Sequence, residues 1–168
     1  MRLEYGGTFD LGSSYAGFIS GIHIERSNNF KAINVEAFNF NRAGINIATS
    51  EDYTDYCHNP KVINCNFHHN RVAGILFGNT DHLEITGCKL EYNGLDTDNG
   101  TGYGCAGWSS KLPKNTFIHH NFASYNYRKG IDFHAGEHGI IDHNICVGNK
   151  YYGIFVDGNV FNEMGDWI

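Results

Sequence analysis

Short apolar segments alternate with polar residues along most of the chain, and five of them begin with the pattern Gly-apolar-x-apolar. They are Gly21-Ile22-His23-Ile24, Gly44-Ile45-Asn46-Ile47, Gly74-Ile75-Leu76-Phe77, Gly130-Ile131-Asp132-Phe133 and Gly153-Ile154-Phe155-Val156, with a degenerate copy at Gly104-Cys105-Ala106-Gly107. Successive glycines are separated by 23, 30, 30, 26 and 23 residues, which gives a base period of 23 with insertions. Self-similarity at such a period is typical of a solenoid.

A second pattern, with Asn, Cys or Glu at turn positions, lies between successive glycines. We assign it to Ile33/Glu36/Phe38/Asn41, Val62/Cys65/Phe67/Asn70, Ile85/Cys88/Leu90/Asn93, Ile118/Asn121/Ala123/Asn126 and Ile141/Asn144/Cys146/Asn149. These segments are short, alternate with period two and end in turn residues, so they predict strands rather than helices.

Strands that recur this often, joined by turns too short for crossover helices, can pair in parallel only by coiling, with about 4.8 Å between turns. The sequence therefore predicts an all-β fold, a right-handed parallel β-helix, as a single domain over residues 1–168 with rungs of 23 residues. Asn121 and Asn144 are expected to stack as an amide ladder. Residues 1–20 are a candidate N-terminal cap, and without an obvious closing element after the last strand the chain is expected to be a fragment of a longer solenoid.

From Ile22 to Asp157 the repeat resembles the parallel β-helix repeats of the pectate-lyase-like superfamily. That resemblance implies a carbohydrate lyase, hydrolase or epimerase, a class that includes phage tailspike depolymerases. It also implies an extracellular or virion-associated location.

Charge and hydropathy narrow the choice of partners. A formal net charge of -6, without a basic run interleaved with aromatics, argues against nucleic acid. No run of 18 apolar residues is present and the first residues lack a signal-peptide core, so neither a membrane partner nor a signal peptide is expected.

The five cysteines are odd in number and form no CxxC pair, which argues against a zinc site or a disulfide framework. Cys65 and Cys88 share a column, so a disulfide between them stays open, although reduced stacking is favoured. The sequence assigns no metal ligands and no cofactor beyond calcium, for which Asp96 and Asp98 are an incomplete motif.

In the glycine motif the second and fourth residues after each glycine are expected to face outward. The first column is His23, Asn46, Leu76, Ala106, Asp132 and Phe155, and the second is Glu25, Ala48, Gly78, Trp108, His134 and Asp157. Trp108, His134 and Asp157 are thus predicted neighbours on consecutive rungs. An acid beside a histidine raises the imidazole pKa, and an exposed Trp ring offers a surface for a sugar, so this face is predicted to be a saccharide site.

The run GIDFHAGEHGIIDHNICVGNKYYGIFVD, residues 130–157, is similar to the catalytic stretch of mannuronan (alginate) C5-epimerases. In that family a Gly-x-Asp-Pro-His signature is followed one rung later by Gly-x-x-x-Asp. The resemblance implies catalytic roles for Asp132, His134 and Asp157, with the aspartates neutralising the uronate carboxylate and the histidine working with a tyrosine. Here Phe133 replaces the proline and Lys129 the tyrosine.

Basic and aromatic residues flank this run. Lys129 is predicted to be a base, a proton donor or a cation for the carboxylate, and Tyr127, Tyr151 and Tyr152 are alternatives for the missing tyrosine. Arg128 and Lys150, together with Lys129, supply the positive charge that an acidic polysaccharide requires.

Three functions stay open. The first is a polyuronate C5-epimerase or lyase. The second is an inverting hydrolase of the tailspike or polygalacturonase kind, because Asp132 and Asp157 are expected about 8 Å apart. The third is a non-catalytic glycan-binding or structural β-helix. In each case the loop insertions Thr49–Pro60, Gly94–Tyr103 and Trp108–Asn115 are expected to form cleft walls.

Overall fold

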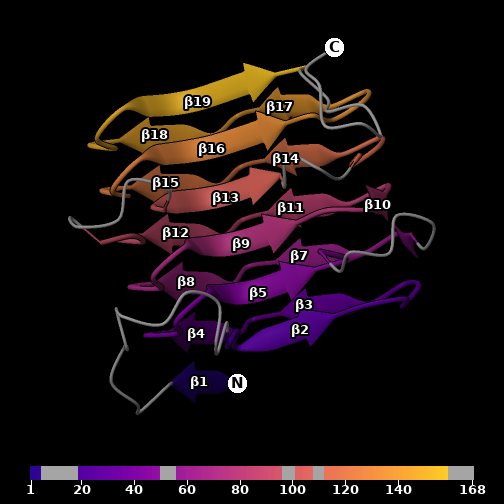
Figure 1. The fold of residues 1–168 in the computed structure, drawn as a ribbon, viewed down its shortest axis with the longest axis horizontal. Coiled ribbons are helices and arrows are strands. Elements are labelled where there is room, and N and C mark those ends of the chain that lie inside the picture. Colours follow the sequence, from indigo (N-terminus) through magenta and orange to yellow (C-terminus); the bar gives the residue numbers. More distant parts are fainter. Residues whose placement is uncertain (5–18, 50–55, 96–100, 108–111, 159–168) are drawn as a thin grey trace, which may run out of the picture.

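The computed structural model describes residues 1–4, 19–49, 56–95, 101–107 and 112–158. All regular elements in these ranges are strands, and they coil into a parallel β-helix (Figure 1). The predicted all-β solenoid is confirmed, with rungs about 26 residues apart when the insertions are included. Within these ranges no helix has the length and apolar character needed to span a membrane.

Three parallel sheets run the length of the coil. Sheet I contains β2 (Ile22–Ile24), β5 (Ala43–Ile47), β9 (Ala73–Phe77), β13 (Tyr103–Gly107), β16 (Lys129–His134) and β19 (Tyr152–Asp157). Sheet II contains β3 (Lys31–Ile33), β7 (Lys61–Ile63), β11 (Glu84–Thr86), β14 (Phe117–His119) and β17 (Ile140–Asp142). Sheet III contains β1 (Arg2–Glu4), β4 (Glu36–Phe38), β8 (Asn66–His68), β12 (Lys89–Glu91), β15 (Phe122–Ser124) and β18 (Ile145–Val147). A separate pair is formed by β6 (Cys57–His58) and β10 (Thr80–Asp81).

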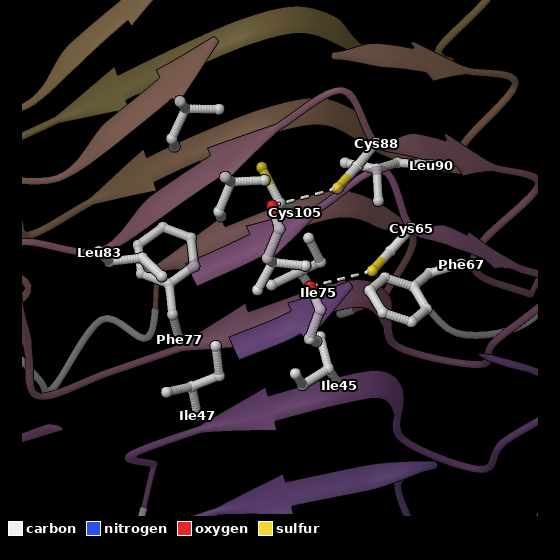
Figure 2. Close-up of a cluster of buried hydrophobic side chains, with 14 of the residues drawn as sticks. Ile45, Ile47, Cys65, Phe67, Ile75, Phe77, Leu83, Cys88, Leu90 and Cys105 are labelled. Atoms are coloured by element: carbon white, nitrogen blue, oxygen red, sulfur yellow. Dashed lines mark hydrogen bonds between the residues drawn. The ribbon is translucent and has the colours of Figure 1, made fainter. Parts of the chain in front are cut away.

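Each rung passes through sheets I, II and III before the next rung begins, so identical positions stack in columns. In sheet I, Ile45, Ile75, Cys105 and Ile131 lie one above the other and are fully buried. Cys65, Phe67, Cys88 and Leu90 reach the same core from the other side (Figure 2). All five cysteines are free thiols, which agrees with the favoured reduced state.

The repeated glycine is required by the close approach of the next rung. A Cβ atom on Gly74 would lie 2.7 Å from the carbonyl oxygen of Gly104, and one on Gly44 would lie 2.7 Å from a ring carbon of Phe67. Neither glycine has a positive φ. Glycine is therefore needed at this position because the next rung leaves no room for a Cβ atom, and not because the backbone conformation is unusual.

Two columns of turn residues at the ends of sheets II and III adopt the left-handed conformation, with φ between 48° and 66°. They are Asn34, Asn64, Gly87, His120 and His143 in one column and Asn39, His69, Tyr92, Tyr125 and Gly148 in the other.

The residue after each of these turn residues points inward. At four rungs that residue is an asparagine of one ladder, in which Asn93 Nδ2 donates to Asn126 Oδ1 and Asn126 Nδ2 to Asn149 Oδ1, both at 2.9 Å. The predicted ladder from Asn121 to Asn144 is also present, at 3.0 Å.

The predicted register of the first rung is wrong by one residue. Ala32, not Ile33, pairs with Val62, and Ala37, not Phe38, pairs with Phe67. The two inward residues are small alanines, so the larger apolar residues beside them were misleading. Ile33 is 49% exposed, and Phe38, although only 7% exposed, stacks on His68 with ring centroids 4.8 Å apart.

The candidate N-terminal cap is only partly described. β1 pairs in parallel with β4 and so extends sheet III by one strand. Residues 5–18 lie outside the described ranges.

Candidate functional site

β16 and β19 lie side by side in sheet I and bring the predicted acids and the histidine together. Asp157 is paired with His134, and Phe155 with Asp132, as the spacing of the glycines predicts. Trp108, the third predicted neighbour, lies outside the described residues, as do Asp96 and Asp98.

Lys129 is bound to Asp132 rather than free in a turn. Its Nζ donates to Asp132 Oδ2 at 2.9 Å, and the two side chains are only 8% and 5% exposed. The ammonium also lies 3.5 Å from the centroid of the Phe155 ring. The cation is therefore enclosed between a carboxylate and an aromatic face, both of which stabilise its charge.

Residues three apart on a regular strand face opposite sides, so this contact requires a local irregularity. The irregularity lies at the glycine of the motif, because on earlier rungs too the residue before the glycine and the second residue after it share one face. Ala73 and Leu76 belong to the same apolar cluster, together with Ala43 and Ala106. Lys129 and Asp132 occupy the corresponding positions on the β16 rung.

Burial raises the pKa of Asp132, and this effect outweighs the hydrogen bond and positive charge of Lys129, which lower it. Its Oδ1 atom is buried and has no hydrogen-bond partner among the described residues. A carboxyl group in this state can retain a proton at a pH where an exposed aspartate has lost it.

His134 lies at the far end of β16. Its Nδ1 is 3.9 Å from Asp157 Oδ2, which is close enough for an ionic attraction but too long for a hydrogen bond. Its Nε2 is buried and has no hydrogen-bond partner in the described part of the chain. The two side chains are 17% and 23% exposed.

An open depression of about 430 Å³ lies beside the ion pair and is lined by Arg128, Lys129, Tyr151, Tyr152 and Phe155. We call it the basic depression. Tyr151 and Tyr152 are each about half exposed. Arg128 Nη1 donates to the Tyr103 hydroxyl at 2.7 Å, and Lys150 Nζ donates to the Tyr127 hydroxyl at 2.5 Å. The predicted cations and tyrosines thus gather at the start of β16 and β19, whereas His134 and Asp157 lie at the ends of these strands.

The outward column of sheet I is exposed at His23 but covered on the four rungs that follow. Asn46, Leu76, Ala106 and Asp132 are at most 4% exposed. Alternation along a strand tells which side of the sheet a residue occupies, but not whether that side is covered. Asp132 is therefore an enclosed acid, not a surface acid.

Two residues of the site were missed as functional candidates. Tyr103 pairs with Lys129 on one side and Tyr152 pairs with it on the other, so a tyrosine flanks the lysine on each neighbouring rung. Phe155 stands beside Asp132 and covers the lysine. Aligning the residues that precede each glycine would have placed Tyr103 next to Lys129. Tyr103 was overlooked because the glycine that follows it, Gly104, belongs to the degenerate copy of the motif.

Stacked columns, three parallel sheets and inward asparagine ladders define a parallel β-helix of the right-handed class. The chain belongs to the family described as the right-handed β-helix region, whose model matches residues 20–166. Searches of curated proteins and of solved structures found no match.

Proposed function

We propose that this chain acts on a polyuronate and abstracts the C5 proton of a uronic acid residue, as a C5-epimerase or lyase. Right-handed β-helix regions are common in polysaccharide-active enzymes and tailspikes, which supports the broader class. The particular reaction is inferred from the chemistry of the residues around β16 and β19.

The observation that carries the proposal is an enclosed carboxyl group of raised pKa beside a basic, aromatic depression. Proton abstraction next to a carboxylate produces an enediolate, which is stabilised by cations and by a protonated acid. Lys129 and Arg128 line the depression and supply positive charge, and Asp132 holds the Lys129 ammonium in place. The half-exposed rings of Tyr151 and Tyr152 offer apolar faces to a sugar.

In the proposed reaction His134 takes the C5 proton as a general base, and the C–H electron pair moves into the enediolate. Asp157, near Nδ1, stabilises the imidazolium that forms. In an epimerase a proton returns to C5 from the opposite face. In a lyase the C4–O bond breaks instead, a C4–C5 double bond forms, and the departing oxygen takes a proton.

The test is incubation with alginate-type and other uronate polymers in D2O. We expect deuterium at C5 by NMR, or near-ultraviolet absorbance from unsaturated chain ends. His134→Ala should lower the rate by about 100-fold or more. His138→Ala, which removes an exposed histidine four residues along, is the matched control and should retain activity. The proposal fails if the wild-type chain yields neither signal on any uronate polymer.

A second function, inverting hydrolysis, is favoured by one observation. Asp132 and Asp157 lie on adjacent strands, offset by two residues, and the pKa of Asp132 is raised as a general acid requires. Hydrolysis would produce new reducing ends with neither unsaturation nor deuterium at C5. Polymer binding that survives Asp132→Asn and His134→Ala, without any product, would instead indicate a non-catalytic glycan-binding protein.

A further inference from the structure

Two histidines and an aspartate converge where β14 and β17 end in sheet II, a different sheet from the one that carries Asp132 (Figure 1). His119 is the last residue of β14, His120 follows it in the turn, and Asp142 pairs with His119 from the next rung. One donor atom from each of the three residues lies within 4.8 Å of the other two. We propose that this cluster binds a divalent transition-metal ion of the zinc type.

The tautomer of His119 suits metal binding. Its Nε2 lies 3.2 Å from Glu84 Oε1. Lys61 Nζ donates to the other oxygen of this carboxylate, Oε2, at 2.6 Å, so Glu84 Oε1 is placed to accept the Nε2 proton. The lone pair of His119 is then on Nδ1, which points toward His120 Nδ1 at 2.8 Å. A carboxylate that orients a histidine in this way is the usual support of a metal-binding imidazole.

Ring stacking holds both histidines in place. The His120 ring stacks on His143, with centroids 4.9 Å apart and an interplanar angle of 3°. The His119 ring stacks on Phe117 at 3.9 Å. Asp142 Oδ1 is buried and lacks a hydrogen-bond partner among the described residues. The rings therefore need little ordering on binding, and one carboxylate oxygen gains a partner.

The ligand set determines the class of ion. Two imidazoles and one carboxylate are borderline ligands that suit zinc, whereas calcium and magnesium favour oxygen ligands. Three protein ligands leave a fourth tetrahedral position for water.

A second pair of adjacent histidines, in sheet III, can be compared with the His119–His120 pair. His68 and His69 repeat the same contact, with their Nδ1 atoms 2.8 Å apart. The acid that pairs with His68 on the next rung is Glu91, whose carboxylate binds Lys89 and Ser124, each at 2.8 Å. An ammonium already neutralises that acid, whereas Asp142 has only the His143 ring 3.5 Å from its Oδ2 and keeps its Oδ1 without a partner in the described part of the chain.

The test is calorimetric titration of the chelator-treated protein with ZnCl2 in a thiol-free reductant. We expect one tight site per chain, and Asp142→Asn or His120→Ala should weaken it by about 10-fold or more. Glu84→Gln should also weaken it, because a neutral amide oxygen accepts the His119 Nε2 proton less strongly than a carboxylate does. Circular dichroism of each variant shows whether the fold is retained.

His69→Ala is the matched control and should leave zinc affinity unchanged. Cobalt substitution gives a second readout, in which the spectrum should lack thiolate-to-metal charge-transfer bands despite the five cysteines. Absence of zinc binding, or binding that Asp142→Asn leaves unchanged, would overturn the proposal. Removal of zinc is expected to leave activity on uronate polymers intact, so the two proposals can fail separately.

Discussion

The enclosed pair of Lys129 and Asp132 shows how two charged residues can occupy positions that hold alanine and leucine on an earlier rung. Ala73 and Leu76 fill these positions two rungs away. Burial of both charges is tolerated because each neutralises the other at 2.9 Å. The pair therefore has a structural role as well, since it fills buried positions of sheet I.

Lys129→Met should lower the free energy of unfolding by about 3 kcal/mol, because it strands the Asp132 carboxyl without its partner. The double variant Lys129→Met with Asp132→Asn should recover most of that loss. Urea denaturation of the wild type, the two single variants and the double variant measures the coupling. Equal stability of Lys129→Met and the wild type would show that the pair makes no net contribution.

The raised pKa of Asp132 predicts a specific pH dependence. The native state retains a proton that the unfolded chain releases, so this contribution to stability is complete below the ordinary aspartate pKa. It is lost as the pH rises through that value toward the raised native pKa. Denaturation over a pH series should show this fall in the wild type, while Asp132→Asn should lack it.

The sequence predicted part of this site for a clear physical reason. Parallel pairing fixes neighbours once the glycine spacing is known, so the adjacency of His134 and Asp157 followed from their positions after Gly130 and Gly153. The capture of Lys129 by Asp132 did not follow, because strict alternation places residues three apart on opposite faces. Only the irregularity at Gly130 brings them together.

At the scale of the strand, the glycine motif gives a direct test of the packing constraint. Gly74→Ala should lower the free energy of unfolding by about 2 kcal/mol, because its Cβ would meet the Gly104 carbonyl oxygen at 2.7 Å. Gly153→Ala is the matched control, since its nearest contact is a Cys146 side-chain atom at 3.1 Å. Thermal or urea unfolding compares the two. Equal effects would mean that backbone freedom, rather than the neighbouring rung, selects glycine.

The limits of prediction differ among the strands. Where the inward residues were large, as at Val62 and Phe67, alternation gave the correct register. Where they were alanines, as at Ala32 and Ala37, the pattern was assigned to the wrong face. Pairing with the next rung decides the register, and a pattern within a single segment lacks that information.

Across the whole molecule, each rung packs only on its neighbours, so stability is expected to vary along the coil. Core residues of the middle rungs such as Ile75 and Ile85 are fully buried, whereas Ile154 and Val156 of β19 are 46% and 63% exposed. Hydrogen exchange followed by mass spectrometry should show the strongest protection in β9 and β11 and the weakest in β17 to β19. Uniform protection would mean that all rungs open in one cooperative step.

The asparagine ladders repeat once per rung, so each rung makes the same hydrogen bonds to the next. From Gly130 to Gly153 the rung has the base length of 23 residues without an insertion, and its inward asparagines accept from the rung below. A duplicated copy of residues 129–151, which also has 23 residues, would present the same amides and the same glycine to its neighbour. The length of the protein can thus change in whole turns by gene duplication, and each added turn would carry its own copy of the Lys129–Asp132 pair.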